Sequence, residues 1–231
     1  MPELPFAMHI PDGFLSGGVA AAAAVLAVVA VGYALKVADR DLDEDRVPLL
    51  GVLAAFIFAV QMLNFPVAGG TSGHLLGAAL AAVLLGPWLA CLVMAVVLTA
   101  QAFVFADGGI TALGANILNM GVLGALLAGL LLAGAARALQ TRGAFLGAVG
   151  VAAWLAVIIG ATATSLELAA SDTVPLDTAL PAMLGVHALI GIGEAVITVA
   201  AVSAVLASRP DLVAMKVPSE RATGPLRPQE S

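Results

Sequence analysis

Long apolar runs, separated by short polar or Gly/Pro-rich stretches, dominate the chain. Seven of them predict helical spans, because about 18 or more consecutive apolar residues are typical of a helix that crosses a bilayer. The predicted spans are roughly 17–35, 47–63, 72–86, 88–105, 113–135, 144–166 and 183–206. The third run is short and is followed by Gly86 and Pro87. It could therefore enter the membrane from a buried loop rather than cross the full thickness.

The composition supports a membrane protein. Apolar residues make up 61% of the 231 residues and charged residues 10%, whereas soluble domains carry about 45–50% and about 25%. No Lys or Arg occurs between Arg46 and Arg137, and Asp107 is the only acid there. A soluble fold cannot leave so much surface uncharged, so the sequence predicts an all-α polytopic protein in a lipid bilayer. The net charge of −6 leaves no basic stripe for nucleic acid, and the lone Cys91 excludes a disulfide framework.

The basic residues indicate how the spans are threaded. With seven spans and the N-terminus outside, all nine Lys and Arg residues fall in cytosolic loops or in the C-terminal segment, as the positive-inside rule requires. We therefore expect a bundle of seven transmembrane helices with a cytosolic C-terminus. Residues 1–7 form an N-terminal extension, residues 8–207 the membrane domain and residues 208–231 a polar, disordered cytosolic tail.

Polar residues that interrupt apolar runs are costly in a bilayer and therefore mark candidate sites. His9 lies just ahead of the first span, where a lone His is usually a surface residue. His74 follows a Pro- and Gly-rich loop that contains Asn64 and Ser72. Non-helical backbone at membrane depth is tolerated where it lines a cavity or is packed within protein. His74 is thus either a ligand or a structural His bonded to a nearby carbonyl.

Two further polar pairs lie inside predicted helices. Asn116 and Asn119 are three residues apart and share a helix face; they either brace a re-entrant N-terminal segment or join helices by hydrogen bonds. His187 and Glu194 are seven residues apart on one face, and Glu194 lies near the middle of its span. Glu194 could pair with His187, accept hydrogen bonds from a neighbouring helix, contact a partner or, with His187, bind a metal ion.

Several motifs together resemble the CbiM/NikM family, the substrate-binding membrane components of energy-coupling-factor cobalt and nickel importers. The resemblance rests on MHIPDGFLS at 8–16, QMLNFP at 61–66, TSGHLLG at 71–77, FADGG at 105–109 and GVHALIGIGE at 185–194. These motifs occur in order and span nearly the whole chain. The family has a seven-helix bundle, in agreement with the number of apolar runs.

The resemblance implies a metal site that carries Co²⁺ or Ni²⁺ as the transported substrate. In the family the Met-His pair is the mature N-terminus, which folds back into the bundle. The implied ligands are the amine of Met8, the amide nitrogen and imidazole of His9, and the imidazole of His74. Four nitrogens in a plane suit Ni²⁺ or low-spin Co²⁺ and disfavour Zn²⁺ and Mg²⁺. A preference for cobalt rests only on likeness to members linked with cobalamin synthesis.

The sequence departs from the family pattern because seven residues precede Met8. An internal Met-His pair has no free amine. Either translation begins at Met8, or the extension is removed, or the metal is bound differently. We expect Met8 to be the true start, because the extension has no targeting character and the motif begins there.

Energy for transport has to come from other chains. Lys occurs only at positions 36 and 216, so the Gly-x-x-x-x-Gly-Lys-Ser/Thr motif of an ATP-binding loop is absent. The resemblance implies a transmembrane coupling protein, two cytosolic ATPases and often a small auxiliary membrane subunit, in a bacterial plasma membrane. The alternatives are an energy-coupling component for an organic micronutrient, and an intramembrane metalloenzyme built on the three His residues and Glu194.

Overall fold

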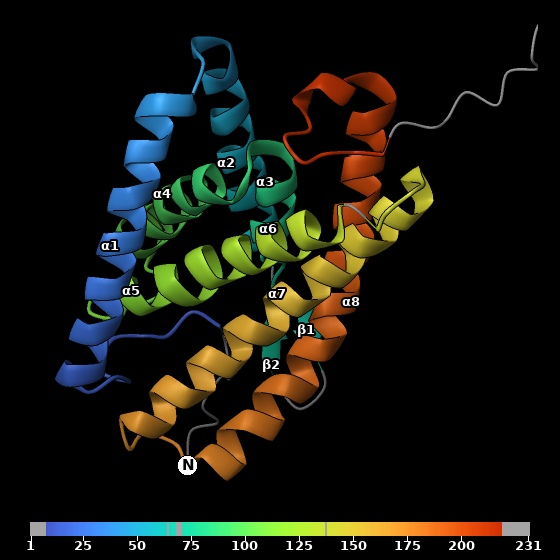
Figure 1. The fold of residues 1–231 in the computed structure, drawn as a ribbon. Coiled ribbons are helices and arrows are strands. Elements are labelled where there is room, and N and C mark those ends of the chain that lie inside the picture. Colours follow the sequence, from blue (N-terminus) through green and yellow to red (C-terminus); the bar gives the residue numbers. More distant parts are fainter. Residues whose placement is uncertain (1–7, 64, 68–70, 137, 219–231) are drawn as a thin grey trace, which may run out of the picture.

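The structure is a computed structural model that describes residues 8–63, 65–67, 71–136 and 138–218, with only the backbone of residues 45, 65–67 and 71–73. Its helices and strands follow one another along the chain (Figure 1) as α1 Gly17–Asp41, η1 Glu44–Arg46, α2 Val47–Gln61, β1 Phe65–Val67, β2 Thr71–Gly73, α3 Ala78–Leu85, α4 Pro87–Phe105, α5 Leu113–Asn116, η2 Ile117–Leu123, α6 Gly124–Ala135, α7 Arg142–Ala170, α8 Leu176–Ser208 and η3 Pro210–Leu212.

The predicted helical membrane architecture is confirmed. In the described ranges, five helices are long and apolar enough to cross a bilayer, and one of them is the continuous run of α5, η2 and α6. Counting that run once, the described residues form seven helical segments. The strands β1 and β2 are three residues each and pair antiparallel, with Phe65 opposite Gly73. The number of true spans and the sides of the termini stay predictions.

Residues 72–86, predicted as a span that could instead enter the membrane from a buried loop, do not form one long helix. Their first part is β2 and an extended stretch, and α3 begins only at Ala78 and has 8 residues. Such a helix is about 12 Å long, which is far less than the roughly 30 Å of a bilayer core. Gly77 has φ +80°, and a Cβ there would lie 2.9 Å from the Ile57 side chain, so the chain turns sharply before α3.

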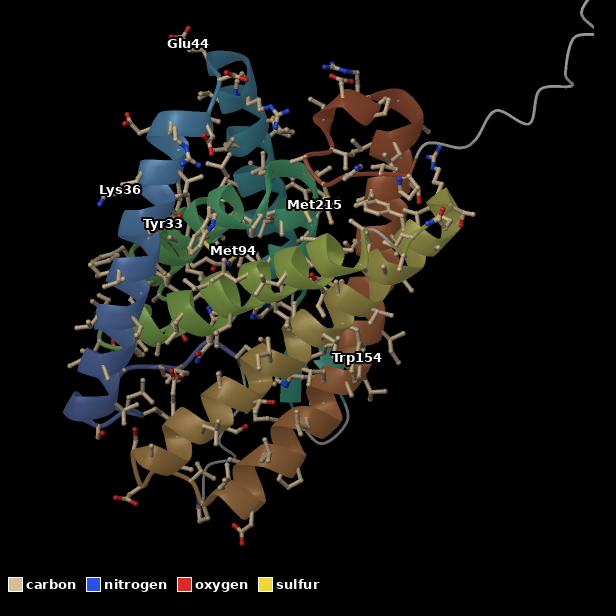
Figure 2. All side chains as sticks on the ribbon, viewed as in Figure 1. Tyr33, Lys36, Glu44, Met94, Trp154 and Met215 are labelled. Carbon is tan, nitrogen blue, oxygen red and sulfur yellow. The ribbon has the colours of Figure 1, made fainter. Side chains whose placement is uncertain are left out.

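The bundle surrounds α3, all of whose residues are buried. α7 and α8 lie side by side as a long hairpin, α6 crosses in front of α4, and α1 runs along the other flank (Figure 1). The connection between α1 and α2 and the C-terminal end of α8 lie at one end of the molecule, and the turn between α7 and α8 lies at the other (Figure 1). Large apolar side chains such as Val28 (70% exposed) cover the outside of α1, as expected for a surface in contact with lipid. Lys36 and Glu44 lie at the α1–α2 end (Figure 2).

Residues 209–217, the C-terminal strap, fold back onto the bundle. Ala214 N donates to Leu84 O and Met215 N to Val83 O, both at 3.2 Å. These carbonyls belong to the last turn of α3, which has no partners for them within the helix. Val213, Met215 and Val217 pack against the core. The predicted tail therefore does not begin at 208 as an unstructured segment, and residues 219–231 lie outside the described part.

Deleting the strap is expected to destabilise the protein. A chain that ends at Ser208 loses two backbone hydrogen bonds, each contributing about 1 kcal/mol. A chain that ends at Pro218 keeps them. Thermal unfolding in detergent should give a midpoint about 4–8 °C lower for the shorter chain than for the longer one, and equal midpoints would show that the strap does not stabilise α3.

Candidate metal centre

The segment that precedes α1 is buried although it is not helical. Met8, His9 and Ile10 are 3%, 5% and 1% exposed. The Met8 side chain packs against Gly160 of α7, where a Cβ would lie 2.7 Å from the Met8 Cε. A side chain at position 160 would therefore push Met8 out of its place. The N-terminal segment thus enters the bundle instead of lying on its surface.

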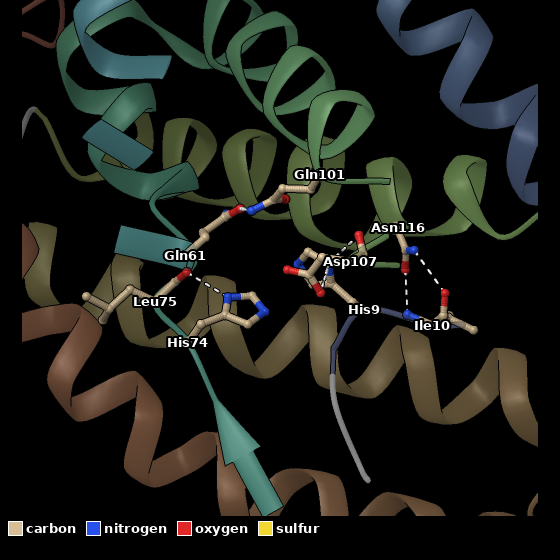
Figure 3. A network of polar contacts seen from close by, with 8 residues as sticks. All are labelled: His9, Ile10, Gln61, His74, Leu75, Gln101, Asp107 and Asn116. Atoms are coloured by element: carbon tan, nitrogen blue, oxygen red, sulfur yellow. Dashed lines mark hydrogen bonds and ion pairs between the residues drawn. The ribbon is translucent and has the colours of Figure 1, made fainter. Parts of the chain in front are cut away.

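Hydrogen bonds from the loop between α4 and α5, and from α5 itself, hold this segment in place. Asn116 Oδ1 accepts from Ile10 N at 2.8 Å, and Asn116 Nδ2 donates to Ile10 O at 3.1 Å (Figure 3). Gly109 N also donates to Ile10 O, at 2.8 Å. Asp12 Oδ1 accepts from Thr111 N at 2.7 Å and from Thr111 Oγ1 at 2.6 Å. The hydrogen bond from the Thr111 side chain is the main reason that the pKa of Asp12 is lowered.

A second set of polar side chains, from α8, α2 and α4, holds the stretch that carries His74. Glu194 Oε2 accepts from Leu76 N and Oε1 accepts from Gly77 N, both at 2.7 Å. Gln61 Nε2 donates to Leu76 O at 2.6 Å. Gln101 Nε2 in turn donates to Gln61 Oε1 at 2.9 Å (Figure 3). Side chains of α8 and α2 thus hold the two peptide groups on either side of Leu76, and Gln101 of α4 holds Gln61 in place.

The two anchored segments bring the imidazoles of His9 and His74 together. Their ring centroids lie 4.6 Å apart with an interplanar angle of 88° (Figure 3). His74 Nδ1 lies 2.9 Å from Leu75 O, and His9 Nδ1 lies 3.3 Å from Asp107 O and 3.4 Å from Asp107 Oδ1. Since a carbonyl oxygen only accepts, both Nδ1 atoms carry the proton. Both Nε2 atoms therefore have a free lone pair.

Neither lone pair has a partner. His9 Nε2 and His74 Nε2 are buried and have no hydrogen-bond partner among the described residues. Burial lowers the pKa of His9 to about 4 and also lowers the pKa of His74, so both rings are neutral near pH 7. Buried polar atoms are normally satisfied, and neutral imidazole nitrogens are common ligands of transition metals. This arrangement is suited to binding a metal ion.

Two imidazoles do not complete a coordination shell. Over the described ranges, no group of three or more His, Cys, Asp or Glu residues is placed to hold a metal ion. Any further nitrogen ligands would therefore have to come from the backbone or from a chain terminus. Because Met8 is buried next to His9 in the sequence, the backbone of the N-terminal segment is the nearest source of further nitrogen ligands.

The other predicted site residues have different roles. Asn116 braces the N-terminal segment, as described above. Asn119 Nδ2 instead joins η2 to α7 by donating to Glu167 Oε2 at 2.6 Å and to Thr164 Oγ1 at 3.3 Å. His187 is buried, and its Nδ1 lies 2.8 Å from Met183 O within α8.

Two predicted positions are not fully described. The backbone of Ser72 lies in β2, opposite Pro66, and Asn64 lies outside the described residues. Gln61 and Gln101 were not predicted as site residues from the sequence. The available signal was the presence of two uncharged amides inside long apolar helices, since such groups are costly in lipid without partners.

The helices and the buried imidazole pair define an integral membrane protein with a candidate transition-metal site. Residues 9–212 match the family model described as CbiM, the cobalt uptake substrate-specific transmembrane region. The match covers most of the chain, so the protein belongs to this family.

Relatives and solved structures agree with this assignment. The chain is 39% identical over 228 residues to the fused nickel transport protein NikMN of Rhodobacter capsulatus, covering 90% of this chain and 64% of that protein. It is 41% identical over 121 residues to the cobalt transport protein CbiM of Sorangium cellulosum, covering 51% and 54%. The crystal structure of a truncated transition metal transporter superposes with a TM-score of 0.77 at 33% identity, covering 86% of this chain and 98% of that one. The fold is thus shared with a metal transporter.

Proposed function

We propose that this chain captures Co²⁺ or Ni²⁺ as the substrate-binding membrane component of an ATP-driven energy-coupling-factor importer. The observation that carries the proposal is the buried pair of His9 and His74 imidazoles, which come from distant parts of the chain and whose ring centroids lie 4.6 Å apart. Family membership supports the same conclusion. Cobalt is the favoured metal, through the likeness to members linked with cobalamin synthesis.

In a chain that begins at Met8, the proposed ligands are the amine of Met8, the amide nitrogen and imidazole of His9, and the imidazole of His74. An amine and the following amide nitrogen close a five-membered chelate ring, and the amide nitrogen and Nδ1 close a six-membered one. In the structure His9 Nδ1 faces Asp107. Metal binding therefore requires the His9 ring to turn so that Nδ1 leaves Asp107. His74 supplies Nε2, its unpartnered nitrogen.

The proposed function also implies an orientation in the membrane and a set of partner proteins. The N-terminus and the metal site face the outside of a bacterial plasma membrane, and the C-terminal strap faces the cytosol. Energy is supplied by two ATPases through a transmembrane coupling protein, with a small auxiliary membrane subunit as a further partner. The supporting observations are the distribution of the nine basic residues and the absence of a phosphate-binding loop in the sequence.

The proposed ligands predict a steep pH dependence of metal binding. Between pH 6 and pH 7 the amine, with a pKa of about 7.7–8.0, has to lose a proton in order to bind, and the amide has to lose another. The imidazoles contribute less, because burial lowers the pKa of His9 to about 4 and also lowers the pKa of His74. The apparent affinity for Ni²⁺ should therefore rise about 100-fold over this interval. A flat profile would mean that only the imidazoles bind.

Uptake tests the transport function itself. Cells that express this chain with the coupling protein and the two ATPases should accumulate radioactive Co²⁺ or Ni²⁺. Cells in which the ATPases lack their phosphate-binding lysine should not. Accumulation that is equal in both strains would contradict an ATP-driven importer, and accumulation of Zn²⁺ at the same rate would contradict a planar nitrogen site.

A further inference from the structure

We infer that Glu194 is the positioning residue for His74: its carboxylate fixes the peptide that sets where the His74 imidazole lies. This inference rests on the proposed function, since it concerns the affinity of the same metal site. Glu194 is 2% exposed and lies in α8, at a distance of 118 residues in sequence from Leu76. The contact between Glu194 and Leu76 therefore forms only in the folded protein.

The carboxylate is fully used by the His74 segment. One oxygen accepts from Leu76 N and the other from Gly77 N, both at 2.7 Å. Both distances are typical of charge-assisted hydrogen bonds. With both oxygens engaged in this way, Glu194 is bonded to the metal-site segment rather than placed as a metal ligand. It thereby acts on the metal through the backbone.

The hydrogen bonds of Glu194 to Leu76 N and Gly77 N, the Glu194 clamp, lie so close to His74 that the His74 backbone has little room to shift. Leu76 is two residues after His74, so their Cα atoms are at most about 7 Å apart. The same peptide is held from the opposite side by Gln61 Nε2 on Leu76 O at 2.6 Å. The His74 ring is also bonded to Leu75 O through Nδ1, which orients Nε2. A displacement of this peptide therefore moves the ligand nitrogen.

The clamp also caps α3. Gly77 is the residue before α3 and has no side chain to cap the helix. A carboxylate at a helix N-terminus is favourable because it meets free N–H groups and the positive end of the helix dipole. A cap alone would stabilise the fold without affecting the metal. The positioning role and the capping role therefore differ in what they predict for metal binding.

The test compares Glu194→Gln with Trp154→Phe as a matched control. The glutamine keeps the size of the side chain but replaces one acceptor oxygen by an NH₂ group, so one N–H of the His74 segment loses its partner. Trp154 Nε1 donates to Ala188 O at 3.0 Å, so the control removes one hydrogen bond to α8 without touching that segment. Ni²⁺ affinity and the visible absorption of the bound Ni²⁺ are measured in detergent, for whichever form of the chain binds the metal.

Glu194→Gln is expected to weaken Ni²⁺ binding at least about tenfold, the effect typical of removing a group that orients a metal ligand, and to shift the absorption band. Trp154→Phe should remain within about twofold of the parent. In a His74→Ala background, Glu194→Gln should have no further effect on the residual affinity, because residues that act as one unit are not additive.

Three outcomes overturn the inference. If Glu194→Gln binds Ni²⁺ within twofold of the parent while His74→Ala loses affinity, or if Glu194→Gln causes the same fold-loss with and without His74, the role of Glu194 alone fails. If His74→Ala itself leaves the affinity unchanged, both this inference and the ligand assignment fail. If Glu194→Gln does not fold, Glu194→Asp, which is too short to reach both N–H groups, is measured against the same thresholds.

Discussion

His74→Ala and His9→Ala should each weaken Ni²⁺ or Co²⁺ binding by at least about 100-fold. Each substitution removes one imidazole from a site of about four ligands, and structural zinc sites with four ligands reach binding free energies of roughly 10–16 kcal/mol. The structure supports these two residues because their ring centroids lie 4.6 Å apart and both Nε2 atoms are buried with no partner among the described residues. Equilibrium titration of the purified variants measures the change.

His187→Gln is the control for these two variants. His187 is equally buried, but its Nδ1 is bonded to Met183 O within its own helix. Glutamine keeps a donor for that carbonyl, so the affinity should remain within about threefold of the parent. A loss of binding in His187→Gln together with normal binding in His9→Ala would place the site elsewhere in the bundle.

A free amine at Met8 is the second requirement with a large effect. A chain that begins at Met8 is expected to bind Ni²⁺ at least about 100-fold more tightly than the chain that retains residues 1–7, because an internal Met8 offers an amide in place of the amine and cannot complete the chelate. Titration of both chains under the same conditions measures the difference. A chain that begins at Met8 and carries an acetylated N-terminus is the matched control, since it removes the amine without adding residues. Equal affinity of all three would remove Met8 from the ligands.

Helix positions were largely predictable from the sequence, because apolar runs report directly on what lies in lipid. The run 113–135 was predicted with the observed bounds, although its middle is the π-helix η2. For the run 72–86 the sequence left open a full span or an entry from a buried loop, since a segment buried within the protein is as apolar as one in lipid. Its 8-residue helix lies between Gly77 and Gly86, both with positive φ, and a hydropathy pattern does not contain these backbone angles.

The candidate site was only partly predictable for a similar reason. His9 and His74 were identifiable as residue types in unusual surroundings, but their proximity depends on contacts between residues far apart in sequence. Asn116 and Asn119 share a helix face, yet only Asn116 contacts the N-terminal segment, while Asn119 contacts α7. Among the alternatives for Glu194, the structure favours hydrogen bonds from a neighbouring segment, and those donors are backbone groups that no sequence pattern marks.

The packing of residues 209–217 against the bundle could not be predicted from composition. Residues 208–231 taken together are polar enough to predict a disordered tail, but three apolar side chains at alternate positions, Val213, Met215 and Val217, pack against the core. The strap provides α3 with hydrogen-bond donors at its C-terminal end. Since Glu194 binds the N-terminal end of the same helix, α3 is fixed at both ends by segments close to the C-terminus.

The most direct test of the central claim is the X-ray absorption spectrum of Ni²⁺ bound to the chain that begins at Met8. The account predicts four nitrogen ligands in a plane, with the scattering of two imidazoles, and predicts that one imidazole is lost in His74→Ala. A six-coordinate spectrum rich in oxygen, or a spectrum with two imidazoles that does not change in His74→Ala, would contradict it.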